Sequence, residues 1–282
     1  MINQKLLVSG ADYFANTIHL NPYYTDDPVD LQRATAEHAL IVSCFRQAGI
    51  EVIEVPPPMD CQDGIYTANW AVVHGGTAIM SNLPKARQPE QAYALQALTN
   101  LGFSCINPTA PNLFSGQADS LICGDRLFGG SGYRSTPETQ TIVANAFGLE
   151  LIPLHTLPKL NDNGSPFWNA TTNNYDSFFY DLDLALGIID ENTIVYCPEA
   201  FDEPSQRKLA DLPINKILVD RTEAINGFAC NLVSTGSTVI MSAQAPKLQA
   251  QLQQRGLTTI TPEVAELKKT GGCIRCISLT LD

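Results

Sequence analysis

The stretch that decides the fold lies near the carboxyl end: Gly271-Gly272-Cys273-Ile274-Arg275-Cys276-Ile277-Ser278-Leu279-Thr280-Leu281. Apolar and β-branched residues dominate it, so we predict a strand over residues 273–281 that follows a Gly-Gly hinge. In a regular strand, side chains three positions apart point to opposite faces. Cys273 and Cys276 are then poor partners for a disulfide bond or a shared metal ion, and Cys276 is held rigidly yet exposed.

Three interpretations of these two cysteines are open. Cys-x-x-Cys is a redox and zinc-binding spacing, but such sites need a second pair or a histidine cluster, and the sequence has neither. Free cysteines are often buried and behave as small hydrophobic side chains. The third interpretation makes Cys276 a nucleophile, and its weight depends on the rest of the chain.

The same terminal strand completes a unit that recurs along the chain. The unit has two strands joined by a tight turn, then a helix and a third strand. Four complete units have turns at residues 74–76, 123–125, 190–192 and 235–237, and helices over residues 89–100, 137–147, 204–212 and 245–255. A fifth unit has strands at residues 5–8 and 51–55 and a helix over residues 29–48. It lacks one strand, which the carboxyl end can supply, so we predict a closed ring; an open α/β sheet is the alternative.

The composition limits the partners. The chain has 282 residues, 44% hydrophobic and 16% charged, and we expect residues 1–282 to form one domain. Its formal net charge of −12 disfavours nucleic acid and anionic membranes and suits a cationic substrate. The sequence shows neither a secretory signal nor a membrane-spanning run, so we expect a cytoplasmic protein with reduced cysteines.

Two polar segments interrupt this pattern. Residues 158–176 are rich in turn-forming residues and contain Phe167 and Trp168, which favours a functional lid over a disordered linker. Asp181 and Asp183 are two apart on a predicted strand and therefore share a face. Two buried carboxylates side by side repel, so one of them needs a proton or a cation. The alternative is a solvated rim.

The chain resembles the pentein, or guanidino-group-modifying, superfamily, which includes arginine deiminases, dimethylarginine dimethylaminohydrolases and amidinotransferases. The resemblance spans nearly the whole chain and rests on Asn21-Pro22, Asp63-Gly64-Ile65-Tyr66-Thr67-Ala68-Asn69, Gly132-Tyr133-Arg134-Ser135, Phe228-Ala229-Cys230-Asn231 and the terminal stretch. It implies a five-bladed α/β propeller of ββαβ units, in agreement with the unit pattern, and a single catalytic domain. It implies no cofactor and no metal, and it allows a homo-oligomer.

The resemblance also assigns roles to residues. Cys276 matches the cysteine that attacks the guanidinium carbon, and Arg134 matches an arginine that pairs with a substrate carboxylate. The positions that match groups of the substrate site are Asp63, Asn69, Asp119 and Asp183. The implied enzyme is a cysteine-dependent hydrolase or amidinotransferase, similar to arginine deiminase, that acts on a small cationic guanidino substrate such as arginine.

The chain departs from the family pattern at two places. Asp181 stands where the family has its general-base histidine, and Ser115-Gly116-Gln117-Ala118-Asp119 replaces a Glu-Gly-Gly-Asp motif, so the glutamate is absent. Asp181 is then the candidate proton carrier, although a carboxylate shuttles protons poorly near neutral pH unless its environment is unusual. The alternative function is an altered pentein that binds a cationic metabolite without hydrolysing it.

Overall fold

A computed structural model describes residues 2–108 and 112–282. In this part of the chain, five three-stranded sheets share one pattern, in which an inner strand pairs antiparallel with a middle strand and the middle strand pairs parallel with an outer one. From inner to outer strand, the sheets are β17 (Leu279–Thr280), β1 (Lys5–Ser9) and β2 (Glu51–Val55); β3 (Ala71–His74), β4 (Thr77–Met80) and β5 (Ser104–Ile106); β6 (Ser120–Cys123), β7 (Arg126–Ser131) and β8 (Glu150–His155); β11 (Leu186–Asp190), β12 (Thr193–Tyr196) and β13 (Asn215–Leu218); β14 (Val233–Ser234), β15 (Thr238–Ile240) and β16 (Thr258–Ile260).

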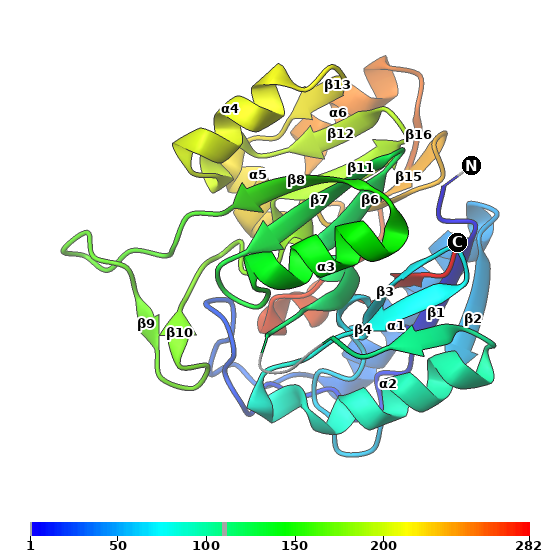
Figure 1. Ribbon diagram of the computed structural model, residues 1–282. Helices are drawn as coiled ribbons and strands as arrows, with labels where there is room; N and C mark the ends of the chain where they lie inside the picture. Colours follow the sequence, from blue (N-terminus) through cyan, green and yellow to red (C-terminus); the bar gives the residue numbers. More distant parts are fainter. Residues whose placement is uncertain (1, 109–111) are drawn as a thin grey trace.

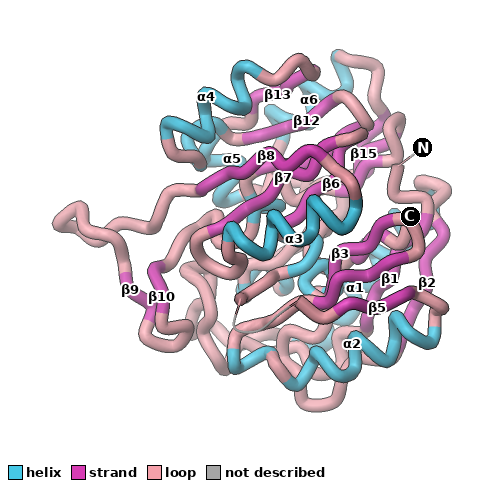
Figure 2. The backbone as a smooth tube through the Cα atoms, in the orientation of Figure 1, coloured by secondary structure: helices cyan, strands magenta, loops and turns pink. Residues whose placement is uncertain are grey.

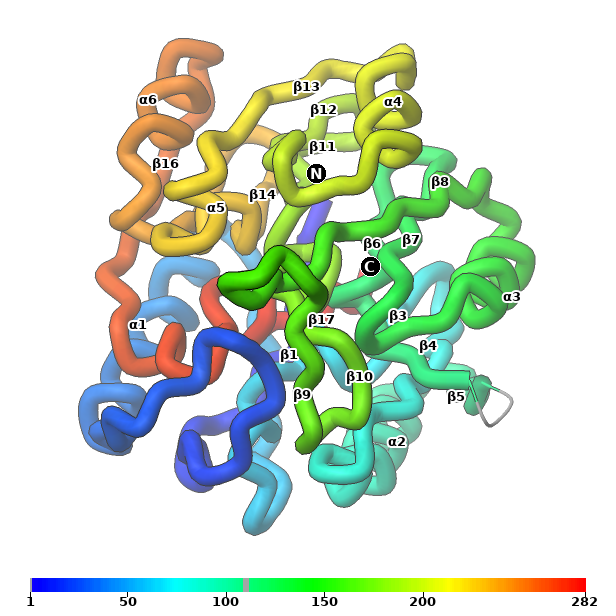
Figure 3. The backbone as a smooth tube through the Cα atoms, turned by 90° about the vertical axis from the view of Figure 1, so that its left-hand side faces the viewer, coloured from blue at the N-terminus to red at the C-terminus, as the bar shows by residue number. Residues whose placement is uncertain are grey.

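One helix accompanies each sheet between its middle and outer strands. These helices are α1 (Leu31–Gln47), α2 (Pro89–Asn100), α3 (Pro137–Phe147), α4 (Glu203–Asp211) and α6 (Pro246–Gln254), and a short additional helix, α5 (Arg221–Asn226), was not predicted. Figure 3 shows the five helices around the outside of a ring with the inner strands towards its centre. The molecule is therefore a five-bladed α/β propeller, as expected.

Local sequence signals begin these helices. The Asp30 side chain accepts a hydrogen bond from the Arg33 amide at the start of α1, and Thr136 caps α3 in the same way through the Thr139 amide. Pro137 occupies the first turn of α3, where its missing N–H costs nothing. The Thr136 cap and Pro137 explain why the predicted bounds of α3 agree with the structure; α2 has no side-chain cap, and Pro89 marks its start.

The two ends of the chain close the ring. β17 pairs antiparallel with β1, with Leu279 opposite Leu7 and Thr280 opposite Leu6. The prediction that the carboxyl end supplies the missing strand is confirmed, and both ends of the chain lie on the same side of the molecule in Figure 1.

The predicted strand over residues 273–281 is wrong for its first part. Residues 273–278 form tight turns instead, with the Ser278 amide donating to the Arg275 carbonyl at 3.0 Å. The amides of Arg275 and Cys276 donate to the side-chain Oδ1 of Asn231, at 2.9 and 3.3 Å, rather than to a neighbouring strand. The hydrophobic residues that suggested a strand are buried because the whole turn is packed in the core.

The segment over residues 158–176 contains a small hairpin. β9 (Trp168–Asn169) pairs antiparallel with β10 (Asn174–Tyr175), and the rings of Trp168 and Tyr175 meet edge to face. The hairpin projects from the ring on the side away from the chain ends, and most of the segment around it is loop (Figure 2). Within the described residues, no helix is long and apolar enough to cross a membrane.

Candidate active site

The candidate site is built from the turns that lead into the inner strands. Asn69 ends the 3-10 turn Thr67–Asn69 before β3, Asp119 directly precedes β6, and Asp183 lies in the 3-10 turn Leu182–Leu184 before β11. Asn231 and Cys276 hold similar places before β14 and β17. Because the five inner strands surround one axis, these turns bring residues from distant parts of the sequence to one place.

Cys276 is buried among polar partners. Its Sγ lies 3.2 Å from the side-chain Nδ2 of Asn231 and 3.6 Å from Asp183 Oδ2. Burial, reinforced by the charge of Asp183, raises the pKa of the Cys276 thiol well above its ordinary value. The expectation of an exposed thiol is wrong, because the side chain is only 3% exposed and requires a partner to ionise.

Asp183 has one satisfied and one unsatisfied oxygen. Oδ2 contacts the thiol, whereas Oδ1 is buried without a hydrogen-bond partner among the described residues. Burial and the nearby charge of Asp181 raise the pKa of the Asp183 carboxyl well above its usual range. An unpaired buried carboxylate oxygen is costly, so this group is suited to a cationic ligand that donates hydrogen bonds.

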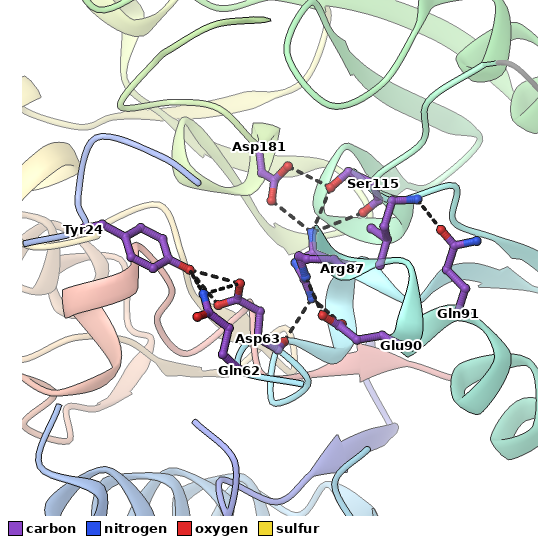
Figure 4. A network of polar contacts seen from close by, with 10 residues as sticks. Tyr24, Gln62, Asp63, Arg87, Glu90, Gln91, Ser115 and Asp181 are labelled. Atoms are coloured by element: carbon purple, nitrogen blue, oxygen red, sulfur yellow. Dashed lines mark hydrogen bonds and ion pairs between the residues drawn. The ribbon is translucent and has the colours of Figure 1, made fainter. Parts of the chain in front are cut away.

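Asp181 is held by two side chains. Its Oδ1 accepts from Ser115 Oγ at 2.8 Å (Figure 4), and its Oδ2 accepts from Asn69 Nδ2 at 3.0 Å. Asp181 precedes the 3-10 turn and is extended, so the predicted strand with both acids on one face is wrong. The turn instead sends Asp181 towards Asn69 and Asp183 towards the thiol.

Asp119 supports this turn. Its Oδ1 accepts from the Leu182 amide at 2.9 Å and its Oδ2 from Ser135 Oγ at 2.6 Å. Burial and the charge of Asp181 raise the pKa of Asp119 well above its usual range. Asp119 does not line the cavity beside Cys276, and it contacts the residue between the other two acids.

Arg87 was not among the predicted site residues. It forms a bidentate pair with Glu90, at 2.8 and 2.7 Å, and donates from Nη1 to Asn69 Oδ1 at 2.7 Å (Figure 4). Both charged side chains are buried, and their i, i+3 spacing at the start of α2 was the available signal. Asn231 and Ser115 were also missed: Asn231 lies in a segment that carries the resemblance, whereas Ser115 lies in the segment that departs from the family motif.

Four of the predicted residues line one small cavity beside the thiol: Asp63, Asn69, Arg134 and Cys276. Tyr24 donates its hydroxyl to Asp63, at 2.8 Å to the nearer oxygen (Figure 4). The cavity has a volume of about 10 Å³, so side chains must move before a ligand larger than water can enter. No histidine lines it, and the described residues contain no cluster of metal-ligand type.

Arg134 lies between this cavity and a second one. Its guanidinium stacks on the Tyr180 ring at 4.1 Å, and Nη2 donates to the Leu20 carbonyl at 3.1 Å. It makes no ion pair with a carboxylate in the described part of the chain. The second cavity, about 270 Å³, is also lined by Tyr175 and Asp176 of the hairpin segment. A carboxylate at Arg134 would therefore lie beneath the hairpin.

Comparisons with known proteins agree with this geometry. The sequence model of the family described as "N,N dimethylarginine dimethylhydrolase, eukaryotic" matches residues 21–281. The chain is 28% identical, over 272 residues, to the N(G),N(G)-dimethylarginine dimethylaminohydrolase of Mycobacterium tuberculosis, with 95% of this chain and 83% of that protein covered. It is 25% identical, over 282 residues, to the bifunctional arginine dihydrolase/ornithine cyclodeaminase ArgZ of Synechocystis, with 98% of this chain covered. The chain spans only 37% of the length of ArgZ.

Solved structures show the same fold. The N-terminal domain of ArgZ, a cyanobacterial arginine dihydrolase solved with its product, superposes with a TM-score of 0.88 at 24% identity, covering 99% of this chain and 97% of that one. A variant of that domain, covalently bonded to a reaction intermediate, also gives a TM-score of 0.88. Since the family match runs from residue 21 to residue 281, this chain belongs to the N,N dimethylarginine dimethylhydrolase family of the pentein superfamily.

Proposed function

We propose that this chain, acting as a single catalytic domain over residues 1–282, is a guanidino-modifying hydrolase in which Cys276 attacks the substrate. The observation that carries the proposal is the pair formed by the buried Cys276 thiol and Asp183, whose second oxygen has no partner. A guanidinium offers a positive charge and several N–H donors in one plane. It can satisfy Asp183 and at the same time favour ionisation of the thiol.

The substrate itself then helps to activate the nucleophile. In the free protein, burial keeps the thiol protonated at neutral pH. A bound guanidinium beside Sγ and Asp183 lowers the pKa of both groups, because an opposite charge favours their ionised forms. The thiol proton passes to Asp183, which lies 3.6 Å away, as the C–S bond forms.

The remaining steps follow from the proton balance. The tetrahedral adduct loses one nitrogen as ammonia or an amine when the proton on Asp183 reaches that nitrogen and the C–N bond breaks. Water then attacks the same carbon and gives one proton to Asp181. The C–S bond breaks, a ureido product leaves, and the proton on Asp181 returns to the Cys276 thiolate. The proton that the guanidinium brought leaves with the released ammonia or amine.

Arg134 supports arginine or an arginine-like amino acid as the substrate. Its guanidinium faces the cavity beneath the hairpin and makes no ion pair with a described carboxylate, so a substrate carboxylate can bind there. Asp63 and Asn69 line the inner cavity and are candidates to hold guanidinium nitrogens. The relatives named for dimethylarginine and for arginine point to the same class of compound.

One observation favours a second candidate, binding without hydrolysis. Both Asp181 oxygens accept hydrogen bonds from Ser115 and Asn69, and no histidine lines the cavity. If Asp181 serves only to hold these side chains, the site binds a cationic guanidino compound and releases it unchanged.

A substrate screen decides between the two candidates. The purified protein is incubated with arginine, monomethylarginine, dimethylarginine and agmatine, and ammonia, amines, urea and ureido products are measured. Product from the wild type but not from Cys276→Ser supports the hydrolase. Calorimetric binding of one of these compounds without any product supports the binding protein, and neither binding nor product contradicts both.

A further inference from the structure

A cavity on the axis of the ring is distinct from the cavity beside Cys276, although Asp183 of the candidate site also lines it. Its volume is about 430 Å³, which is within the range of small-molecule sites. It is lined by inner-strand residues that include Val73 of β3, Leu121 of β6, Leu186 of β11 and Thr280 of β17. Ile2 and Asp282 also line it, which places it towards the side of the molecule where the chain ends lie in Figure 1, away from the hairpin.

Among the described residues, Arg275 is the only arginine or lysine in this lining, which also includes His74. It is 7% exposed, and no described carboxylate forms an ion pair with it. Of its guanidinium nitrogens, only Nη1 donates to the described residues, to Thr280 Oγ1 at 3.0 Å and to Asn3 Oδ1 at 3.4 Å. Burial lowers the pKa of Arg275 to about 10. A buried guanidinium with unused donors is suited to an anionic group, above all a carboxylate.

The remaining lining restricts what such a ligand can be. Leu121, Leu186 and Leu232 offer apolar surface, and the acids that line the cavity are Asp183, Glu191 and Asp282. These acids and the net charge of −12 disfavour a ligand with several negative charges. Glu191 is exposed and can receive an ammonium group from a ligand that reaches in to Arg275.

We propose that the axial cavity binds a free α-amino acid with an apolar side chain. Its carboxylate pairs with Arg275, its ammonium group faces Glu191, and its side chain packs on the leucines of the inner strands. The site does not depend on the proposed hydrolase activity, because none of its three contacts belongs to the cavity beside Cys276.

The two sites are physically connected. Asn231 Oδ1 accepts from the backbone amides of both Arg275 and Cys276, and Asn231 Nδ2 contacts the Cys276 thiol. Asp183 lines the axial cavity and also contacts that thiol. An amino acid bound to Arg275 therefore lies next to residues that hold Cys276 in place.

Calorimetry with three matched probes tests the chemistry of the site. L-Leucine carries all three features, 4-methylpentanoate lacks the ammonium group, and isopentylamine lacks the carboxylate. The expected order of affinity is leucine, then 4-methylpentanoate, with no detectable binding of isopentylamine. Glu191→Gln should weaken leucine binding and leave 4-methylpentanoate binding unchanged. Equal binding of leucine and isopentylamine, or no binding of leucine at millimolar concentration, overturns the proposal.

A pair of arginine variants locates the ligand. Arg275→Gln and Arg134→Gln each neutralise a buried arginine that has no ion pair, one in the axial cavity and one near the thiol. Leucine affinity should fall by about tenfold or more in Arg275→Gln, as expected for loss of a charged hydrogen bond, and should be retained in Arg134→Gln. The opposite pattern places the ligand in the substrate site and overturns the proposal. If Arg275→Gln does not fold, the proposal can still be tested by leucine binding to Arg275→Lys and Glu191→Gln and by the series of three probes.

Discussion

Asp181 and Asp183 lie two residues apart and are both buried, yet their carboxylates have opposite surroundings. Both oxygens of Asp181 accept hydrogen bonds, from Ser115 and Asn69. Oδ2 of Asp183 contacts the Cys276 thiol, and its Oδ1 is buried without a hydrogen-bond partner among the described residues. Asp181, with both oxygens hydrogen-bonded, belongs to a network of side chains, whereas Asp183, with one oxygen lacking a partner, requires a ligand.

The acid with both oxygens hydrogen-bonded, Asp181, is also the one that departs from the family pattern. Cys276 matches the family nucleophile, and Asp183, the acid beside it, matches a family position. Asp181 replaces a histidine, and its partner Ser115 lies in the segment that lacks the family glutamate. If the proposed function is correct, the nucleophile and its acid are kept, while the groups that would carry protons have been replaced together. The following predictions test whether these two parts act separately.

The largest effect is expected at the thiol. Cys276→Ser should abolish product formation, because a hydroxyl in the same buried place is a far weaker nucleophile than a thiolate. Cys273→Ser is the matched control. Cys273 is also fully buried, but it does not line the cavity, and the charge that acts most strongly on it is that of Lys268, so turnover should be largely unchanged. Equal loss of turnover in two folded variants would contradict the role of Cys276.

Asp183→Asn should weaken binding of a guanidino ligand and stabilise the free protein. Loss of a charged hydrogen bond corresponds to about tenfold to over a hundredfold in affinity, measured by calorimetry. Folding raises the pKa of the Asp183 carboxyl, so its ionised form is disfavoured in the folded protein. The free energy of unfolding of the wild type therefore falls as the pH rises above the pKa that this carboxyl has in the unfolded chain.

The stability gained by Asp183→Asn should depend on pH. The melting temperature of Asp183→Asn should exceed that of the wild type at pH 7, and the gap should narrow as the pH falls towards about 4, the unfolded value. A gain of about 1 kcal/mol corresponds to roughly 2–4 °C in a chain of this size. A lower melting temperature with unchanged ligand affinity would show that Asp183 is a structural group.

Asp181 should show a smaller effect, on rate rather than on affinity. If it carries protons, Asp181→Asn removes one limb of the pH–rate profile while substrate affinity falls only modestly. If it holds the guanidinium directly, affinity falls first. Asp181→His restores the family residue; we expect this variant to be inactive, because the family glutamate is also missing near Gln117. A gain of ordinary deiminase activity in Asp181→His would contradict this expectation.

Much of the fold could be predicted from local sequence. β2, α2 and α3 begin and end where the pattern placed them, because prolines, caps and tight turns mark their limits. The strand predicted over residues 273–278 was wrong because a turn that is buried on all sides has the same hydrophobic content as a strand. Its backbone partner is Asn231, which is distant in sequence and invisible to any local pattern.

The candidate site shows the same limit. Cys276 and the acids were identified because the family motifs lie near them, and the structure brings them to one end of the ring. Arg87 was missed because nothing local shows that its guanidinium reaches the Asn69 side chain. The two states of Asp181 and Asp183 could not be predicted either. They depend on a turn of 3-10 helix where the sequence suggested a strand.

The smallest effect is expected at the hairpin of β9 and β10. Residues 171–173 at its tip, together with Tyr175, line the cavity that also contains Arg134. A substrate carboxylate on Arg134 would lie against this segment, so ligand should slow proteolytic cleavage within residues 158–176. Limited proteolysis with and without a saturating guanidino amino acid measures this. Agmatine, which lacks the carboxylate, is the control and should protect less. Equal cleavage in all three conditions would mean that the hairpin is a surface feature and that the unpaired Arg134 does not receive the ligand.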